Sequence, residues 1–428
     1  MSSGGEANSE IASSLGMGTA NGSLKTVSSM AREAAEGWPH ICLVWAWVPS
    51  NHSGAAIIMR RLLQDYPAGK LWLLTSSIGL RSTASRDPVP APGYCHAVSR
   101  FASARRLLGP IVDALNYSMV PFIVSRGIRL IRRNSIKKII AVPWNDYSLA
   151  AYLLHLLTGS ELFVYVMDDS FGEPSRSRMR RPLYNLLMGR VLRSAKRVWA
   201  ISPYMCESLE KRFRVKCVSH PPFIDVDDFA RQCRGTSRQA DHEVHLVYTG
   251  AVYSAQLDAL RDLIQVVNSG RILPERRVIL TLYTELSESD LRKLGLYGSC
   301  IRRSQVPASE MARALASADI LFLPYSFQGE MRHLVETSMP TKLAEYLVSG
   351  VPILVYAPQY ASITRYCRKH GFGMVVDKKD HAELEQSLRR LTMDDKLRGV
   401  LVDRALKTAA AHHDRRHAVA SFLRDLAS

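Results

Sequence analysis

The stretch Ala318–Pro358, ADILFLPYSFQGEMRHLVETSMPTKLAEYLVSGVPILVYAP, decides the fold class. Its apolar runs Ile320–Pro324 and Val351–Val355 have the length and residue types of buried strands. Between them, Pro340–Gly350 has a helical pattern, with a proline suited to a first helical turn and a glycine suited to a helix end. Because a helical crossover usually joins two buried parallel strands, the stretch predicts a βαβ unit in a parallel sheet.

The start of this expected helix carries residue types that suit an anion. Free backbone N–H groups and the helix dipole favour a phosphate at such a position. Thr341 and Lys342 add a hydroxyl and a cation, and Glu345 adds a carboxylate one turn further on, which can bind a polyol such as ribose. The residues alone leave a second interpretation open, in which Lys342 and Glu345 are solvated helix positions.

The run Pro340–Leu347, followed by Gly350-Val351-Pro352, resembles the nucleotide-sugar motif of GT-B glycosyltransferases, especially the retaining enzymes of family 4, also called group 1. The resemblance implies that Glu345 binds the ribose hydroxyls of a nucleotide-sugar donor. Many members carry another glutamate eight positions earlier, which touches the donor sugar. That position is Thr337 here, with Glu336 beside it, so the chain departs from the pattern at the donor sugar.

Residues 40–48 predict a first buried strand that leads through Ser53-Gly54-Ala55 into a helix over Ala55–Asp65. Ligands of open α/β sheets bind beyond the carboxyl ends of the strands. The turn at Gly54 also resembles the small-residue loop that GT-B transferases place near the donor phosphates and the acceptor. Gly54 is therefore a candidate binding residue, although glycine in a turn is also common for conformational reasons alone.

A second polar strand end follows the expected strand Leu162–Val166, where the sequence continues Met167-Asp168-Asp169. The resemblance implies that an acid or histidine at this point faces the site. Asp168 is therefore a candidate catalytic residue that contacts the acceptor hydroxyl. Capping of the following turn is the other interpretation that the residues allow.

The second half begins with the expected strand Val244–Tyr248, followed by Thr249 and Gly250. Related enzymes often place an arginine and a lysine just beyond this glycine, where they hold the donor diphosphate. Here the segment is Val252–Gln256, which has no cation, so the charge must come from elsewhere. Other candidates for phosphate or nucleotide contacts are Lys342, Arg332, His333, Arg60 and, through its backbone near the base, Val306.

The net charge of +17 is concentrated in one half of the sequence. Residues 38–235 carry +15 of it, and Arg126, Arg129, Arg132 and Arg133 alternate with apolar residues in a segment that precedes an expected strand. Such a surface suits lipid-linked diphosphates, polyanionic glycans or an anionic membrane surface. Nucleic acid ranks lower as a partner because no binding motif is present.

Length and composition limit the remaining choices. A chain of 428 residues can form two ordinary domains. It has no apolar run long enough to span a bilayer and no secretion signal. Residues 1–37, rich in Ser, Gly and Ala, predict a disordered leader. Seven scattered cysteines without a CxxC pair favour neither a zinc site nor a disulfide framework, and they fit the cytoplasm.

Together these features predict an α/β protein of the GT-B class, with two doubly wound Rossmann-like domains facing across a cleft. We expect an acceptor domain at 38–235, a polar linker around Asp227–Glu243, a donor domain at 236–410, and a terminal helix at 411–428 that packs on the first domain. The expected function is retaining transfer of a hexose from a nucleotide-diphosphate sugar to a glycan or lipid-linked hydroxyl, without a metal or other cofactor, in the cytoplasm or on the inner face of the membrane. The alternatives are a non-catalytic nucleotide- or glycan-binding protein of the same fold, and a basic nucleic-acid or membrane-surface protein.

Overall fold

A computed structural model provides the structure of the chain. It describes residues 38–51, 53–79, 88–89, 93–97, 109–143, 145–168, 180–236 and 243–428. The expected leader at 1–37 lies outside these described residues.

The first sheet runs through the first half of the chain. Among the described residues it has seven parallel strands in the order β3-β2-β1-β4-β5-β6-β7. The strands are β1 Ile41–Val44, β2 Leu71–Ser76, β3 Gly93–Ala97, β4 Lys138–Ala141, β5 Glu161–Val166, β6 Arg197–Ala200 and β7 Cys217–Ser219. Described residues of the central strands are almost fully buried, as expected for a parallel sheet covered by helices on both faces.

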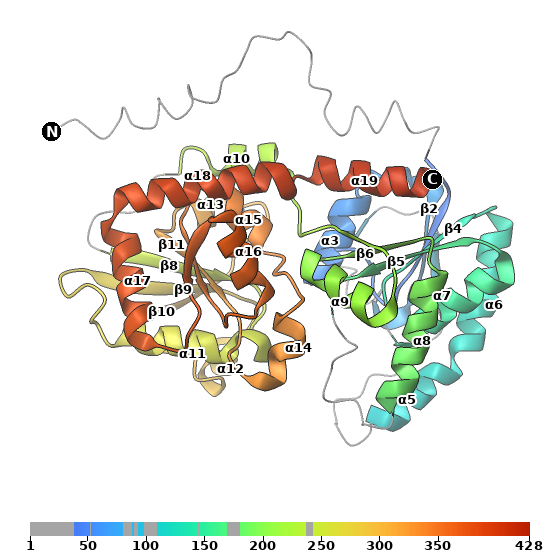
Figure 1. The fold of residues 1–428 in the computed structure, drawn as a ribbon, viewed down its shortest axis with the longest axis horizontal. Helices are drawn as coiled ribbons and strands as arrows, with labels where there is room; N and C mark the ends of the chain where they lie inside the picture. The colour runs from blue at the N-terminus through green and yellow to red at the C-terminus, as the bar shows by residue number, and fades with distance from the viewer. Residues whose placement is uncertain are drawn as a thin grey trace, which may run out of the picture. The chain divides into compact units, whose positions relative to one another are not determined.

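Helices flank the sheet of this domain (Figure 1). They are α3 Gly54–Leu63, α5 Gly109–Ser118, α6 Val120–Arg133, α7 Asn145–Thr158, α8 Arg180–Ser194 and α9 Pro203–Phe213. In α3, the side chain of Ser53 caps the N-terminus by accepting a hydrogen bond from the amide of Ala56. Its buried face includes Ile58, Met59 and Leu62, which fixes how the helix lies on the sheet.

The second sheet has six parallel strands in the described chain, in the order β10-β9-β8-β11-β12-β13. They are β8 Glu243–Thr249, β9 Arg277–Tyr283, β10 Ile301–Ser304, β11 Ile320–Pro324, β12 Ile353–Tyr356 and β13 Gly373–Val376. The predicted βαβ unit is present, because β11 pairs with β12 in parallel register from Leu321–Ile353 to Pro324–Tyr356.

The helices of the second half pack around this sheet and around one apolar core. They are α10 Val226–Cys233, α11 Ser254–Asn268, α12 Glu288–Lys293, α13 Met311–Ala316, α14 Arg332–Val335, α15 Leu343–Val348, α16 Ser362–His370, α17 His381–Met393, α18 Asp395–His412 and α19 Arg415–Ala427. The last of these, α19, lies on the first domain, where Phe422 contacts the ring of Trp199 at 5.1 Å between centroids.

Both sheets have the doubly wound order, and each reverses direction beside its first strand. The reversals lie between β1 and β4 and between β8 and β11. In such sheets, ligands bind beyond the carboxyl ends of the strands at these reversals. Gly54 begins the helix α3 that follows β1, and Gly250 directly follows β8, so both glycines lie at these ends of the strands.

Two segments connect the domains, and they pair with each other. The amide of Ile224 donates to the carbonyl of His413, and the amide of Arg415 donates to the carbonyl of Ile224, at 2.9 and 2.8 Å. His413 is fully buried, with Nδ1 2.5 Å from the carbonyl of Pro222 and Nε2 3.1 Å from the hydroxyl of Tyr366. These hydrogen bonds hold together the two segments that connect the domains.

The linker expected over Asp227–Glu243 is wrong for its first part. Residues Val226–Cys233 form the helix α10, capped by the side chain of Asp225 and packed on α13 and α15. The polar composition that suggested a linker is the solvated face of this helix, because only Phe229 of its residues is buried. We therefore propose that the chain crosses between the domains just before Asp225 rather than near residue 235.

Candidate active site

The motif helix α15 begins at Leu343, three residues later than the expected start at Pro340, and it has only six residues. The reason is a tight turn in which the amide of Leu343 donates to the carbonyl of Pro340 at 3.0 Å. In this turn the amide of Leu343, one of those expected to bind a phosphate, is already hydrogen-bonded within the protein. Side-chain charge must therefore carry more of any anion binding here than the helix terminus does.

Lys342 lies at the N-cap of α15 with its amine on an aromatic face. Its Nζ is 3.7 Å from the centroid of the Tyr248 ring, at the end of β8. Burial lowers the pKa of this amine to about 7, and the nearby carboxylate of Glu345 opposes the shift. In the described part of the chain no carboxylate makes a salt bridge with Lys342, so an anionic ligand would be its natural counter-ion.

The helix itself is held by a tyrosine. The hydroxyl of Tyr346 accepts a hydrogen bond from the amide of Thr249 at 3.0 Å, at the carboxyl end of β8. Gly250 follows with a φ of +99°, which strongly favours glycine. A Cβ built on Gly250 would lie at ordinary van der Waals distance, 3.5 Å, from Cε and Nζ of Lys342, so the residue after β8 lies beside this amine.

Glu345 contacts a residue from the other domain. Its Oε1 forms an ion pair with Nη2 of Arg61, which lies near the end of α3, and both side chains are mostly buried, at 17% and 16% exposure. Nη1 of Arg61 donates to the carbonyl of Phe223 at 3.2 Å, in a crossing segment. The sequence analysis named Arg60 as a phosphate candidate and missed Arg61. The apolar pattern of α3 shows which face of the helix is buried, but it does not show which residues of the other domain face its polar side.

The two glycine candidates and the motif meet in space. A Cβ built on Gly54 would lie 2.5 Å from Oγ1 of Thr341, so even a methyl group there would force the threonine hydroxyl to move. The loop after β1 therefore touches the turn before α15. The structure thus brings Gly54, Gly250, Thr341, Lys342 and Glu345 together.

Thr337 occupies the position where relatives often carry a glutamate. It is buried, its hydroxyl donates to the carbonyl of His333 at 3.3 Å, and its own carbonyl accepts a hydrogen bond from the hydroxyl of Ser202. Glu336 instead forms a surface ion pair with Arg332 at 3.2 Å. In this structure neither residue offers a free carboxylate in place of the missing one.

Asp168 follows β5 and approaches the second domain. Burial raises the pKa of the Tyr325 hydroxyl well above its ordinary value, and the nearby charges of Tyr253 and Asp168 add to the effect. Tyr325 directly follows β11, so Asp168 lies close to the strand ends of the opposite domain. The structure thus places this acid near the motif domain, without showing its role.

Two of the other phosphate candidates are engaged locally. Arg332 lies over the ring of Tyr360 at 4.6 Å in addition to its pair with Glu336, and Nδ1 of His333 is 2.9 Å from the carbonyl of Glu330. Val306 is half-buried after β10, in keeping with a backbone role only. Of the phosphate candidates, Lys342 is the residue that the described geometry best supports.

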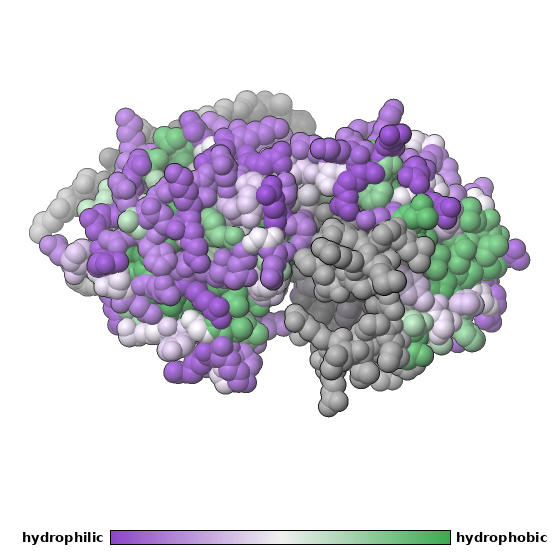
Figure 2. All heavy atoms as spheres, turned by 60° about the horizontal axis from the view of Figure 1, so that its bottom comes forward, coloured by the Kyte–Doolittle hydropathy of each residue, from purple (hydrophilic) through white to green (hydrophobic). Residues whose placement is uncertain are grey.

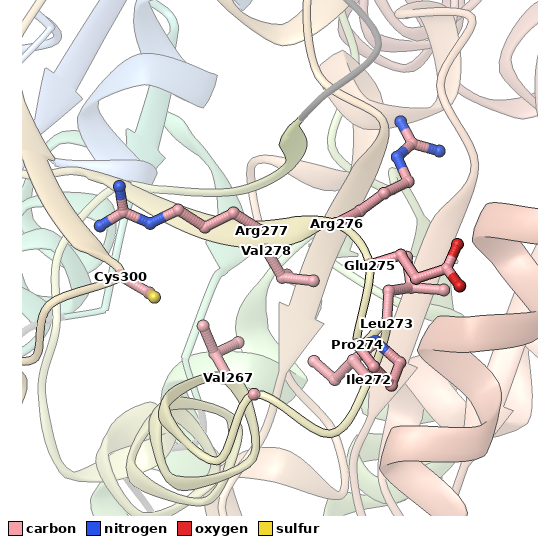
Figure 3. A pocket seen from close by; sticks show the side chains of 10 residues that line it. Val267, Ile272, Leu273, Pro274, Glu275, Arg276, Arg277, Val278 and Cys300 are labelled. Atoms are coloured by element: carbon pink, nitrogen blue, oxygen red, sulfur yellow. The ribbon is translucent and has the colours of Figure 1, made fainter.

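A surface pocket of about 260 Å³ lies elsewhere, beside the start of β9 (Figure 3). Its lining includes Val267, Pro274 and Cys300, and the side chains of Arg276 and Arg277 extend in different directions. This is the amino-terminal end of the strands, opposite the edge where such sheets bind ligands. The described residues contain no cluster of three or more His, Cys, Asp or Glu side chains placed to hold a metal ion.

Comparisons with known proteins agree with this arrangement. Residues 243–394 match the family described as "Glycosyl transferases group 1", and this segment includes the motif and every described strand of the second sheet. No curated protein sequence matches the chain.

Solved structures match over almost the whole chain. Sucrose-phosphate synthase from Thermosynechococcus elongatus aligns with a TM-score of 0.64 and 14% identity, covering 91% of this chain and 98% of that one. Trehalose 6-phosphate synthase from Burkholderia multivorans gives 0.61 and 12%, covering 91% and 97%. Anabaena HepE in complex with UDP gives 0.60 and 12%, covering 90% and 99%. The chain therefore has the GT-B fold, and its residues 243–394 match the model of the group 1 glycosyltransferase family.

Proposed function

We propose that this protein is a retaining glycosyltransferase that moves a hexose from a nucleotide-diphosphate sugar to an acceptor hydroxyl. The observation that supports this most directly is the cluster of Lys342, Glu345 and Gly250 at the reversal of the second sheet, within the segment that matches the glycosyltransferase family. One protein of similar fold, Anabaena HepE, was solved with UDP and with UDP-glucose, which makes a uridine donor the first candidate.

In this proposal Glu345 accepts hydrogen bonds from the ribose, and Thr341 and Lys342 lie against the diphosphate. The bond between the anomeric carbon and the diphosphate oxygen breaks, and negative charge develops on the departing phosphate. An ammonium on Lys342 stabilises that charge in a partly dehydrated site, where a fixed cation has a larger effect than in water.

The acceptor hydroxyl attacks on the face that the donor phosphate leaves, and its proton passes to the departing phosphate oxygen. Atoms and charges then balance without a separate protein base. Asp168, beside the strand ends of the second domain, would contact and orient the acceptor hydroxyl. Such positioning can supply much of the rate enhancement of a group-transfer enzyme.

We further propose a membrane-bound or polyanionic acceptor, on the basis of the helices of the first domain. Phe122 of α6 is 58% exposed, and Leu156 and Leu157 at the end of α7 are 56% and 55% exposed. Figure 2 shows a hydrophobic area over this part of the surface. Arg132 and Arg133 of α6 are also exposed, and α6 packs along α7. Apolar and basic side chains in the same helices suit an anionic lipid surface.

No helix in the described ranges has the length and hydrophobicity of a membrane span. Binding to lipid would therefore use the surface of α6 and α7. The test is sedimentation with vesicles of phosphatidylcholine alone and with an added anionic lipid, for the unmodified protein and for Leu156→Ser/Leu157→Ser. We expect binding only to the anionic vesicles and its loss in the variant; equal binding to both vesicle types would contradict the proposal.

The transferase itself is tested first by thermal unfolding with a panel of nucleoside diphosphates. A ligand that binds only the folded state raises its stability in proportion to RT ln(1 + [L]/Kd), about 2.7 kcal/mol at a hundredfold excess over Kd. We expect a selective shift with one base, lost in Glu345→Ala. No shift with any nucleotide in the unmodified protein would refute the proposal.

A non-catalytic binding protein of the same fold is the second candidate. Two observations favour it: Thr337 replaces a carboxylate, and Val252–Gln256 lacks a cation. The two candidates differ in turnover. Selective nucleotide binding, without release of nucleoside diphosphate from any nucleotide sugar and over a range of acceptors, would support the binding protein.

A further inference from the structure

The ion pair between Arg61 and Glu345 connects the acceptor domain to the residue that would hold the ribose. We propose that Arg61 is a positioning residue for the donor ribose, so that the ribose subsite is completed by the first domain. This proposal rests on the proposed function, because it assigns a role to the partner of Glu345.

Only one of the two carboxylate oxygens of Glu345 is bound by Arg61. Arg61 binds Oε1 of Glu345, and within the described chain Oε2 accepts no hydrogen bond. A carboxylate has lone pairs on both oxygens, so Oε2 is available to the hydroxyls of a ribose. A neutral hydroxyl does not readily displace a guanidinium from a carboxylate, because a charge-assisted hydrogen bond is the stronger one. We therefore expect the sugar to bind beside Arg61 and not in its place.

Arg61 is itself held firmly. Its side chain donates to the carbonyl of Phe223 at 3.2 Å, and its own carbonyl accepts a hydrogen bond from Nε of Arg415. The guanidinium of Arg415 is 2% exposed and forms an ion pair with Asp65 at 2.7 Å. These contacts come from α3, from a crossing segment and from the start of α19. The bond to Phe223 holds the Arg61 guanidinium directly, and the contacts of Arg415 hold the end of α3 from which it projects.

Because the Arg61 side chain is held in place, its ion pair also restricts the side chain of Glu345. A free glutamate side chain must lose rotamer freedom when it binds a ligand, and that loss weakens binding. A glutamate already held at Oε1 has lost this freedom in advance. Arg61 therefore strengthens the bond to the ribose hydroxyls without touching the donor, and its effect depends on those hydroxyls.

That dependence separates positioning from a general structural role. Removing the 2′-hydroxyl of the ligand deletes a hydrogen bond to the carboxylate, which costs roughly tenfold in affinity for a charged partner. We expect the unmodified protein to bind UDP about tenfold more tightly than 2′-deoxy-UDP. In Arg61→Ala this preference should fall to about twofold, as it should in Glu345→Ala.

The chain offers a matched control. Arg365 of α16 also joins the two domains, through an ion pair with Glu207 at 3.1 Å and a stacking contact with Tyr204 at 3.9 Å. Arg365→Ala removes another interdomain cation, although a more exposed one, and leaves Glu345 untouched. It should keep the tenfold preference. Arg61→Lys, which retains the charge but not the two-branched donor geometry, should restore part of the preference.

The measurement is the dissociation constant of UDP and 2′-deoxy-UDP, by calorimetry, for the five proteins. Loss of the preference in Arg61→Ala but not in Arg365→Ala would support the proposal. A tenfold preference for UDP that persists in Arg61→Ala would overturn the proposal. Tighter binding of UDP by Arg61→Ala would also overturn it, because Arg61 would then compete with the ribose for Glu345. If Arg61→Ala does not fold, Arg61→Gln carries the same test. Failure of UDP to bind the unmodified protein would instead refute the uridine donor on which the proposal rests.

Discussion

The buried amine of Lys342 makes a prediction about stability that needs no ligand. Its pKa lies at about 7 in the folded protein because of burial, against 10.5 for an ordinary lysine. Between these values the unfolded chain binds more protons than the folded one. Stability must therefore rise with pH in this window, and the cost of burying the ammonium is fully present below pH 7.

The magnitude follows from the two values. One pKa unit corresponds to about 1.4 kcal/mol, and integration of the proton difference between pH 7 and 9 yields about 2 kcal/mol from this one group. Other groups also titrate over this range, so the quantity to measure is a difference between two proteins. Lys342→Met keeps a similar volume and removes the titrating amine.

The assay is urea unfolding of both proteins at pH 7, 8 and 9. At pH 7 we expect the variant to be the more stable protein, apart from any loss of the contact with the Tyr248 ring. Its advantage should shrink by about 2 kcal/mol by pH 9. If the difference in unfolding free energy between the two proteins stays constant with pH, the amine keeps an ordinary pKa. Burial would then not favour an anionic ligand beside Lys342.

Three further outcomes are expected. Phe422→Ala should lower the free energy of unfolding by about 3 to 5 kcal/mol, because it empties a buried site against Trp199, as checked by urea unfolding. Cys206 and Cys217, whose sulfur atoms are 2.6 Å apart, should cross-link on mild treatment with a small-molecule disulfide, and this is seen by mass spectrometry after alkylation. Burial lowers the pKa of the His413 imidazole to about 4, so the protein should become less stable as the pH falls from 6.5 to 4. The measurement is thermal unfolding over this range, with His413→Gln as the reference.

Each of these has a result that would contradict it. A Phe422→Ala protein within 1 kcal/mol of the original would mean that α19 contributes little to the first domain. Two thiols that both remain free to alkylation after oxidation would exclude the pairing. If His413→Gln and the original lose stability equally between pH 6.5 and 4, the imidazole is not the group responsible.

Much of the fold could be predicted because the central strands are apolar and regular. The strand Ile320–Pro324 was expected and is observed with the same bounds. The short strand β7 was missed, since its three residues are only half-buried and the lateral position in the sheet imposes little pattern. The strand β3, at the other edge of that sheet, was missed as well.

The site was predictable in part for a different reason. Lys342 and Glu345 belong to one short motif, so their separation along the chain nearly determines their separation in space. Arg61 is 284 positions away from Glu345, and no local pattern can reveal such a pairing. The later start of α15 was also hidden, because a proline suits both the first turn of a helix and the tight turn that precedes it here.

The terminal helix α19 has a consequence for how this architecture can evolve. Trp199 of the first domain donates its indole N–H to Asp425 at 2.7 Å and packs on Phe422, so residues from the end of the chain complete a core built near its start. A gene fragment ending before α18 would encode the whole first sheet but leave this tryptophan uncovered. The first domain therefore cannot be exchanged between proteins as a contiguous module. This domain must change within its loops and helices, or by exchange that carries both ends of the chain together.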